Sequence, residues 1–100
     1  MGTYSLTNAA GADLKSVAVY TQRRWGTEQR RNYSKQFDDA FLLLASNPDT
    51  GLSCDHIKEG YKKFPTGSHT IFFRIISESE IQIVRIPHKR TDVAQQLGGT

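Results

Sequence analysis

The sequence predicts an α+β fold with the element order β-α-α-β-β-β-α, in which a helix hairpin packs on a small antiparallel sheet. Two long stretches with apolar residues at helical spacing fill the first half of the chain, up to Asn47-Pro48. Three runs of β-branched and aromatic residues, separated by short polar turns, fill most of the second half. Since helices followed by strands place the helices on one face of a sheet, we expect a single domain over residues 1–100.

A short strand at residues 4–6 is expected to lead into the first helix, which Asn8 can cap. Gly26 follows this helix at the position where helices often close, and Thr27 can cap the next one. Apolar positions recur at helical spacing in both helices: Leu14, Val17, Ala18, Thr21 and Trp25, then Tyr33, Phe37, Ala40, Phe41 and Leu44. So short a link predicts an antiparallel hairpin. We expect Tyr20 and Trp25 to fix this hairpin to the core.

Three strands are expected at residues 61–64, 69–76 and 81–86, joined by short turns as an antiparallel meander. The first strand is expected to return to this sheet. A last short helix is predicted to begin at Thr91 or Asp92 and to end at Gly98-Gly99. The hairpin then covers one face of the sheet, and the last helix or a partner covers the other.

Composition excludes several classes of protein. The longest apolar run has six residues, Ala40 to Ala45, whereas a membrane span needs about 20. The N-terminus has neither the basic nor the apolar region of a signal peptide, so none is expected. The single cysteine, Cys54, rules out an internal disulfide and suits the cytoplasm. Three scattered histidines and one cysteine give no metal-ligand spacing, so neither a metal nor a cofactor is expected.

Basic residues form two clusters, although the net charge is only +3. The first lies at the hairpin tip, where Glu28 is the one acidic residue between residues 22 and 36, and it consists of Arg23, Arg24, Arg30, Arg31 and Lys35. The second lies at the end of the last strand and consists of Arg85, His88, Lys89 and Arg90. Either cluster can meet an anionic partner, and either can be solvated surface charge without a partner.

Taken in order, four pieces of the chain resemble the ParE toxins of the ParE/RelE superfamily, over roughly residues 4–97. The first helix of that family is matched by residues 6–10, 12–14, 20–21 and 25–26. Its second helix and exit are matched by residues 40–41, 44–45, 47–48 and 51. Its central hairpin and its C-terminal motif are matched by residues 60–64, 69–74 and 83–86, then His88, Arg90 and Asp92.

This resemblance implies a cytoplasmic toxin of a type II toxin–antitoxin pair. The antitoxin, of the ParD kind, wraps the toxin with its C-terminal tail, and its ribbon-helix-helix domain binds operator DNA. Freed toxin blocks DNA gyrase and so stops replication, without catalysis and without a small-molecule substrate. Three positions depart from the family pattern: Pro87 stands where Leu is usual, Thr91 where Met is usual, and Phe73 where Tyr is frequent. Pro87 and Thr91 place the potency or the target in question.

Two alternatives remain open at this point. The RelE branch shares the fold and cleaves messenger RNA on the ribosome, which requires an acid or base and cations. Arg74, Arg85, His88 and Arg90 are candidates for such a set. The second alternative is a detoxified relic that only binds antitoxin. By contrast, we expect His69 to be a structural residue and the Cys54 and His56 pair to carry no chemistry.

Two sets of residues are predicted to make the contacts with partners. Target inhibition is assigned to Arg85, His88, Lys89 and Arg90, with the reservation that Arg85 can instead be buried and paired within the sheet. Antitoxin binding is assigned to the tip residues Arg23, Arg24, Arg30 and Arg31, which would meet acidic side chains. It is also assigned to an apolar wall on an outer strand and its neighbour, made of Tyr61, Phe64, Phe72 and Phe73, which would accept a tail that folds on binding.

Overall fold

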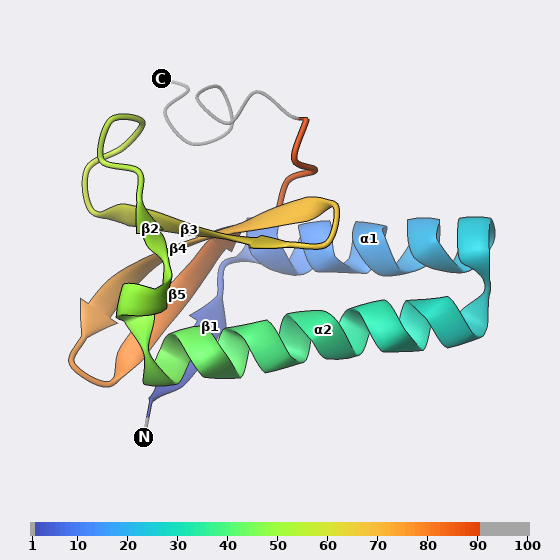
Figure 1. Ribbon diagram of the computed structural model, residues 1–100, viewed down its shortest axis with the longest axis horizontal. Helices are drawn as coiled ribbons and strands as arrows, with labels where there is room; N and C mark the ends of the chain where they lie inside the picture. The colour runs from blue at the N-terminus through green and yellow to red at the C-terminus, as the bar shows by residue number, and fades with distance from the viewer. Residues whose placement is uncertain (1, 91–100) are drawn as a thin grey trace.

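The computed structural model describes residues 2–90, in which two helices lie against a five-stranded sheet (Figure 1). The elements are β1 (Thr3–Leu6), α1 (Asn8–Trp25), α2 (Thr27–Ser46), the short 3-10 helix η1 (Pro48–Thr50), β2 (Leu52–Ser53), β3 (Tyr61–Thr66), β4 (His69–Ser77) and β5 (Glu80–Arg85). The α+β prediction with a helix hairpin is confirmed. The last predicted helix, beginning at Thr91 or Asp92, lies outside the described residues.

The strand order in the sheet is β1-β5-β4-β3-β2, and the sheet is mixed rather than wholly antiparallel. β3, β4 and β5 form the predicted antiparallel meander, but β1 pairs with β5 in parallel, from Thr3 opposite Glu80 to Leu6 opposite Ile83. Residue patterns indicate that a strand exists, but they do not give the direction in which it meets a partner far away in sequence. The two-residue strand β2 on the other edge was not predicted either.

Both helices begin one residue earlier than expected, at caps that the sequence analysis did not select. Thr7, not Asn8, caps α1, because its hydroxyl accepts a hydrogen bond from the Ala10 amide at 3.0 Å. The same hydroxyl donates to the Val84 carbonyl at 2.8 Å and so ties the start of α1 to β5. Gly26, at φ 98°, precedes α2 in place of the Thr27 cap and makes no side-chain bond. Its positive φ explains why glycine stands at the tight link between the helices.

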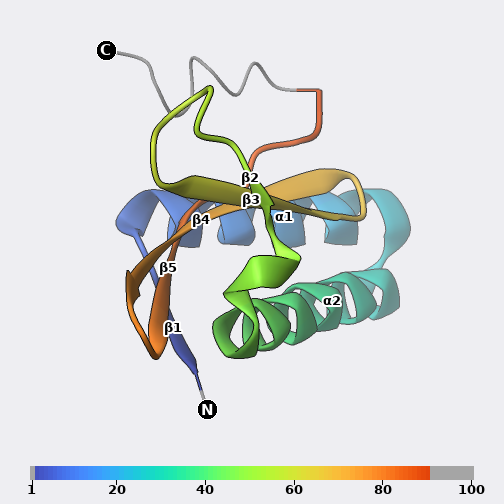
Figure 2. The ribbon, with the colours of Figure 1, turned by 60° about the vertical axis from the view of Figure 1, so that its left-hand side comes forward.

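The helix hairpin lies against one face of the sheet (Figure 2), and the side chains of the core fill the space between them. Its largest fully buried side chains from α2 are Phe37, Phe41 and Leu44, which pack against Phe73 and Ile83. A second, smaller cluster lies on the opposite face and joins Phe72 to Cys54, where burial raises the pKa of the thiol. Strand alternation therefore gives the two neighbouring phenylalanines to different clusters.

The prediction that Tyr61, Phe64, Phe72 and Phe73 form one exposed apolar wall for the antitoxin is wrong. Phe72 and Phe73 are buried, with exposed fractions of 1% and 0%. Phe64 packs against the main core, whereas Tyr61 packs against the second cluster on the other face of the sheet. The four side chains are aromatic and close in sequence, but consecutive strand positions point to opposite faces, so no single groove can contain them all.

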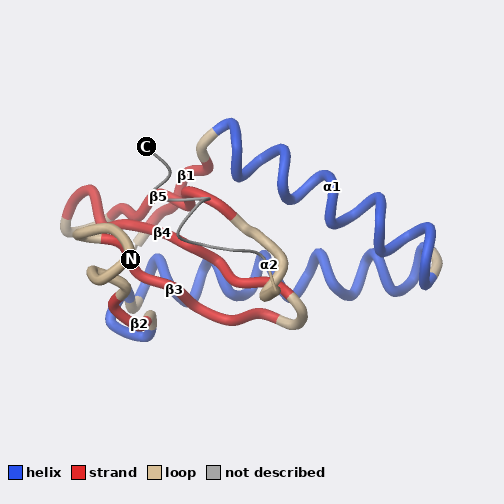
Figure 3. Tube along the Cα trace, turned by 90° about the horizontal axis from the view of Figure 1, so that it is seen from above, coloured by secondary structure: helices blue, strands red, loops and turns tan. Residues whose placement is uncertain are grey.

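The helices are longer than the sheet is wide. At the end where Gly26 joins them, both α1 and α2 extend past the strands, which the views along two directions show (Figures 1 and 3). Neither helix, within residues 2–90, combines the length and apolar character that would let it cross a membrane.

Candidate functional site

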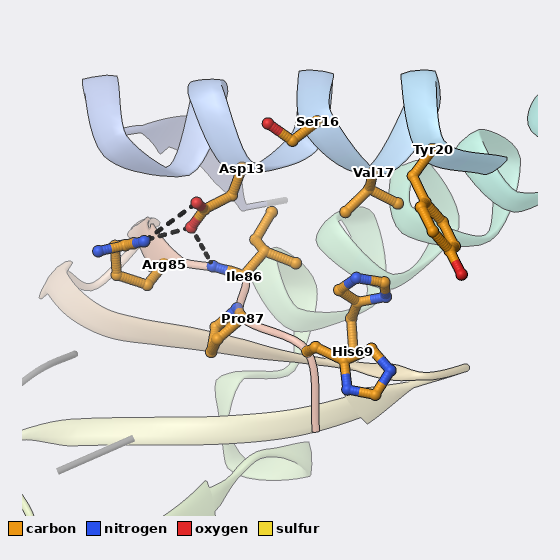
Figure 4. Close-up of a pocket in the computed structure, with 9 residues that line it drawn as sticks. Asp13, Ser16, Val17, Tyr20, His69, Arg85, Ile86 and Pro87 are labelled. Atoms are coloured by element: carbon orange, nitrogen blue, oxygen red, sulfur yellow. Dashed lines mark hydrogen bonds and ion pairs between the residues drawn. The ribbon is translucent and has the colours of Figure 1, made fainter. Parts of the chain in front are cut away.

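The end of β5 is anchored to α1 through a single carboxylate. Asp13 accepts hydrogen bonds from Nε and Nη2 of Arg85, at 2.8 and 3.1 Å, and from the backbone amide of Ile86, at 2.9 Å (Figure 4). The ion pair is largely enclosed, with side-chain exposed fractions of 29% for Arg85 and 19% for Asp13. The hydrogen bonds that Arg85 donates to Asp13 raise the pKa of Arg85 above its ordinary value. Arg85 therefore holds the strand end to the helix and is not free to contact a partner.

The segment after β5, residues 86–90, continues beside the start of β4. Thr70 donates its amide hydrogen to the Pro87 carbonyl, and Lys89 donates to the Ser68 carbonyl, both at 2.9 Å. The register that places Phe72 opposite Arg85 also places His69 opposite His88, so Pro87 lies opposite Thr70. Proline cannot return the second hydrogen bond of such a pair. Residues 86–90 therefore stay in register with the start of β4 although one backbone hydrogen bond is missing. Pro87 does not redirect them away from that strand.

His69 links this segment to α2. Its Nδ1 lies 2.8 Å from the Tyr33 hydroxyl, and its ring meets the His88 ring edge-on at a centroid distance of 5.3 Å. Burial, with the neighbouring His88 as a smaller cause, lowers the pKa of His69. Tyr33 also accepts from the Ser68 amide at 2.9 Å, and burial raises its pKa. The expectation that His69 is a structural residue agrees with these contacts.

Three side chains at the exit of β5 remain exposed: His88, Lys89 and Arg90. The Arg90 amide donates to Nδ1 of His88 at 3.1 Å, which fixes the turn that carries them. Beside them lies a shallow groove of about 380 Å³ between α1 and the strand exit, lined by Asp13, Ser16, Val17, Tyr20, His69, Arg85, Ile86, Pro87 and His88 (Figure 4). The arrangement offers cationic and hydrogen-bonding groups on a backbone held at several points, as a preorganised site requires.

The four arginines at the hairpin tip are all exposed, but they do not share one face. Arg24 lies over the Trp25 ring, at 5.4 Å from its centroid, whereas Arg23 lies on the outer side of α1 near Val19. Arg30 donates to the Gln22 side chain at 2.7 Å, and Arg31 lies with it on the outer side of α2. The prediction that Tyr20 and Trp25 fix the hairpin to the core is wrong, because each is 62% exposed.

Tyr33 does what Tyr20 and Trp25 were expected to do. Besides contacting His69 and Ser68, its hydroxyl donates to the Thr66 carbonyl at 3.2 Å, so one α2 side chain holds the β3–β4 turn. Gly67 closes that turn at φ 60°, and a Cβ there would lie 2.5 Å from the Tyr33 ring. Sequence reasoning placed Tyr33 on the apolar helix face but gave no signal for its hydroxyl.

Asp13 is the site residue that sequence reasoning missed. The one available signal was its place one turn before Val17 on the core-facing side of the first helix, where a carboxylate needs a partner.

The structure does not bring together all the cations that were considered for an RNA-cleaving site. Arg74 pairs with the Gln82 side chain at 2.9 Å on the sheet face opposite to Arg85, which points to α1. Among the described residues, no three His, Cys, Asp or Glu side chains are placed to hold a metal ion.

Comparison with known proteins identifies the family to which this chain belongs. A family model described as the ParE toxin of the type II toxin–antitoxin system parDE matches residues 4–93. Toxin ParE1 of Mycobacterium tuberculosis is 40% identical over 94 residues, which are 94% of this chain and 96% of that protein. Toxin ParE1 of Caulobacter vibrioides is 30% identical over 98% of this chain and its own full length.

A solved structure, the chromosomal ParDE TA system from P. aeruginosa, shares the fold. It superposes with a TM-score of 0.73 at 21% identity, covering 88% of this chain and 96% of that one. The family match and the relatives span nearly the whole sequence, including the anchored exit of β5. The chain therefore belongs to the ParE toxin family of type II toxin–antitoxin systems.

Proposed function

We propose that this chain is a cytoplasmic toxin that inhibits DNA gyrase without catalysis and that a ParD-like antitoxin neutralises it. The observation that carries the choice of effector surface is the anchored exit of β5. Its backbone is held by Asp13, Ser68 and Thr70, while His88, Lys89 and Arg90 stay exposed. A rigid segment with unburied cations can bind an anionic surface of a target with little loss of conformational entropy.

The effector set is narrower than the sequence analysis proposed. Arg85 helps to anchor the strand end, because it donates two hydrogen bonds to Asp13. The Ile86 amide donates a third hydrogen bond to the same carboxylate. We therefore assign target contact to His88, Lys89 and Arg90, and to Arg85 only the positioning of their backbone. A gyrase surface that recognises this segment would be acidic.

For the antitoxin, we propose two kinds of contact. The exposed tip arginines Arg23, Arg24, Arg30 and Arg31 attract acidic residues of the antitoxin and set the rate of association. Large aliphatic side chains that are exposed in this chain alone would be covered by its tail: Val19, Leu42, Leu43, Leu52, Ile75 and Ile76. Operator DNA would then be bound only through the antitoxin.

Ribosome-dependent RNA cleavage is the alternative, and the geometry supports it less. Such a reaction needs its cations around one phosphate, yet Arg74 lies across the sheet from Arg85 and Arg85 is engaged by Asp13. His88 and Arg90 alone would have to serve as acid, base and cation.

Induced expression in a gyrase-containing host tests the proposal. We expect growth arrest with induction of a DNA-damage reporter and unchanged message integrity, and full rescue by a co-expressed ParD-like antitoxin. Cleavage of messages on translating ribosomes would replace the gyrase proposal with the RelE-type reaction. Absence of any growth effect, with antitoxin binding retained, would identify the chain as an antitoxin-binding relic.

A further inference from the structure

The overhanging end of the helix hairpin carries side chains of a different kind from the half that covers the sheet. On the core-facing side of α2, Phe37, Phe41 and Leu44 are buried, but toward the tip the same side carries Gln29, Asn32 and Gln36. On α1, Tyr20 and Trp25 occupy the corresponding region. These side chains line a groove of about 380 Å³ together with Thr21, Arg24, Tyr33, Ser68, His69 and His88.

We propose that this overhang groove binds a short stretch of single-stranded nucleic acid. Its bases would stack on Tyr20 and Trp25, and its base edges would meet the side-chain amides of Gln29, Asn32 and Gln36. Its phosphates would lie beside Arg24, the tip arginine that lines the groove. This site borders the effector segment at His88 but does not depend on the chain's acting on gyrase.

The aromatic side chains provide the first argument. Tyr20 and Trp25 are each 62% exposed, although Trp25 continues the spacing of the buried Val17 and Thr21 along the helix. The Arg24 guanidinium lies over one face of the exposed Trp25 ring, 5.4 Å from its centroid. Aromatic rings interleaved with arginine are the usual platform on which unpaired bases stack, since every base has a π-face.

The amide row provides the second argument. Gln29, Asn32 and Gln36 follow one another at i, i+3 and i+7, so they lie along one side of α2. Asn32 donates to the Gln29 side chain at 3.3 Å, which links two of the three. Each amide offers both donors and an acceptor, which matches the mixed edges of nucleobases. A groove that binds only an apolar helix would have aliphatic residues, and not amides, at these three positions.

Charge decides the kind of partner. Between residues 22 and 36 there are five cationic side chains and one acidic one, Glu28. This excess of positive charge favours an anionic ligand. An acidic peptide can pair with the arginines, as proposed for the antitoxin, but it supplies no base faces to stack on Tyr20 and Trp25. A duplex hides its base faces within the stack. Only an unpaired polynucleotide supplies phosphates, exposed base faces and base edges together.

The chain contains one tryptophan, Trp25, so its fluorescence reports on this groove directly. The full chain would be titrated with an oligothymidylate of about 12 nucleotides, within the site sizes that such grooves cover. A duplex of equal length and a polyglutamate of equal charge are the comparison ligands. We expect quenching of Trp25 and affinity at least about tenfold higher for the single strand. Equal affinity for polyglutamate would identify an acidic-peptide site and overturn the proposal, as would the absence of quenching.

Two neighbouring arginines provide a matched control. Arg24→Gln removes a cation from the groove, whereas Arg23→Gln removes the same charge from the outer side of α1. With a labelled oligothymidylate and anisotropy detection, we expect about tenfold weaker binding for Arg24→Gln and for Tyr20→Ala, but only about twofold for Arg23→Gln. Circular dichroism verifies that each variant keeps its helices. Equal losses for the two arginine variants would mean non-specific attraction and would contradict the proposed site.

Discussion

The two basic clusters of this protein look alike in sequence but differ in what their cations do. At the exit of β5, Arg85 is largely enclosed and its guanidinium is bound to Asp13 at 2.8 Å. At the hairpin tip, all four arginines are exposed, and their contacts are to Gln22 and to the Trp25 ring. One cluster thus contains a cation that stabilises the fold, whereas the other consists of cations available to a partner.

The difference follows from the neighbouring elements rather than from the basic residues themselves. Arg85 is at the end of a strand that passes under α1, where a carboxylate is within reach. The tip has no sheet beneath it, because the hairpin extends past the strands (Figure 3). Counting charges therefore locates a surface for an anionic partner only after the enclosed ion pairs have been identified.

The largest expected effect comes from breaking the anchor at the exit of β5. Asp13→Ala leaves the Arg85 charge largely enclosed without its partner and the Ile86 amide without its acceptor. We expect the free energy of unfolding to fall by about 2–3 kcal/mol, measured by urea denaturation.

Asp39 provides the matched control, since its ion pair with Lys35 is exposed. The exposed fractions of the two side chains are 63% for Asp39 and 75% for Lys35. Asp39→Ala should lower the free energy of unfolding by less than about 0.5 kcal/mol. If the two aspartate substitutions cost the same, Asp13 does not anchor the strand.

Charge reversal at the tip should act on association rather than on the fold. Replacing Arg23, Arg24, Arg30 and Arg31 by Glu is expected to slow antitoxin association about tenfold at low salt and to reduce its salt dependence. Surface plasmon resonance at two salt concentrations measures both. The exit variant with His88, Lys89 and Arg90 replaced by Ala is the control, which should associate at the wild-type rate. A tip variant that also associates at that rate would remove these arginines from the antitoxin surface.

Pro87→Leu has a smaller expected effect and refines the description of the exit segment. The substitution gives the Thr70 carbonyl a backbone donor and should raise the free energy of unfolding by about 0.5 kcal/mol. It should also increase inhibition of gyrase, because the segment is then held by one more bond. Pro65, exposed and beyond the β3 residues that pair with β2, is the control, and Pro65→Leu should bring no gain. A loss of stability in Pro87→Leu would show that the proline ring is needed for packing there.

The smallest effect concerns pH. Because burial lowers the pKa of His69 below its unfolded value near 6.5, the unfolded chain binds a proton more readily than the folded one. The contribution of neutral His69 to stability is complete above pH 6.5 and is lost as pH falls toward its folded pKa. Thermal melts between pH 7.5 and 5 should show a steeper decline for the wild type than for His69→Gln, with His56→Gln as an exposed control. Parallel declines for the wild type and His69→Gln would exclude His69 as the cause.

Much of this fold was predictable from local patterns. The helical spacing of Phe37, Ala40, Phe41 and Leu44 identified the core face of α2, and all four are buried. The runs around Phe72 and Ile83 identified strands that the structure contains. Such patterns fail where a feature depends on contacts distant in sequence, as with the parallel pairing of β1 and the bond between Asp13 and Arg85, 72 residues apart.

The site residues were predicted less well than the fold, for the same reason. His88, Lys89 and Arg90 are exposed, which the contact proposed for them requires. Phe72 and Phe73 were assigned to a surface although a nine-residue central strand buries both of its faces at this point. Trp25 follows the helical period of the core residues, but the period does not reveal where the sheet beneath the helix ends.

Inhibition of supercoiling by purified gyrase is the most direct test of the central claim, that His88, Lys89 and Arg90 contact the target and Arg85 only positions them. Wild type, the triple Ala variant of these residues and the tip variant with four Glu substitutions would be titrated in parallel. Since exposed charges each contribute under about 1 kcal/mol to folding, the triple variant should remain folded. The account predicts inhibition by the wild type and the tip variant and at least about a tenfold loss in the triple variant. Equal inhibition by the triple variant and the wild type, or none by the wild type, would contradict it.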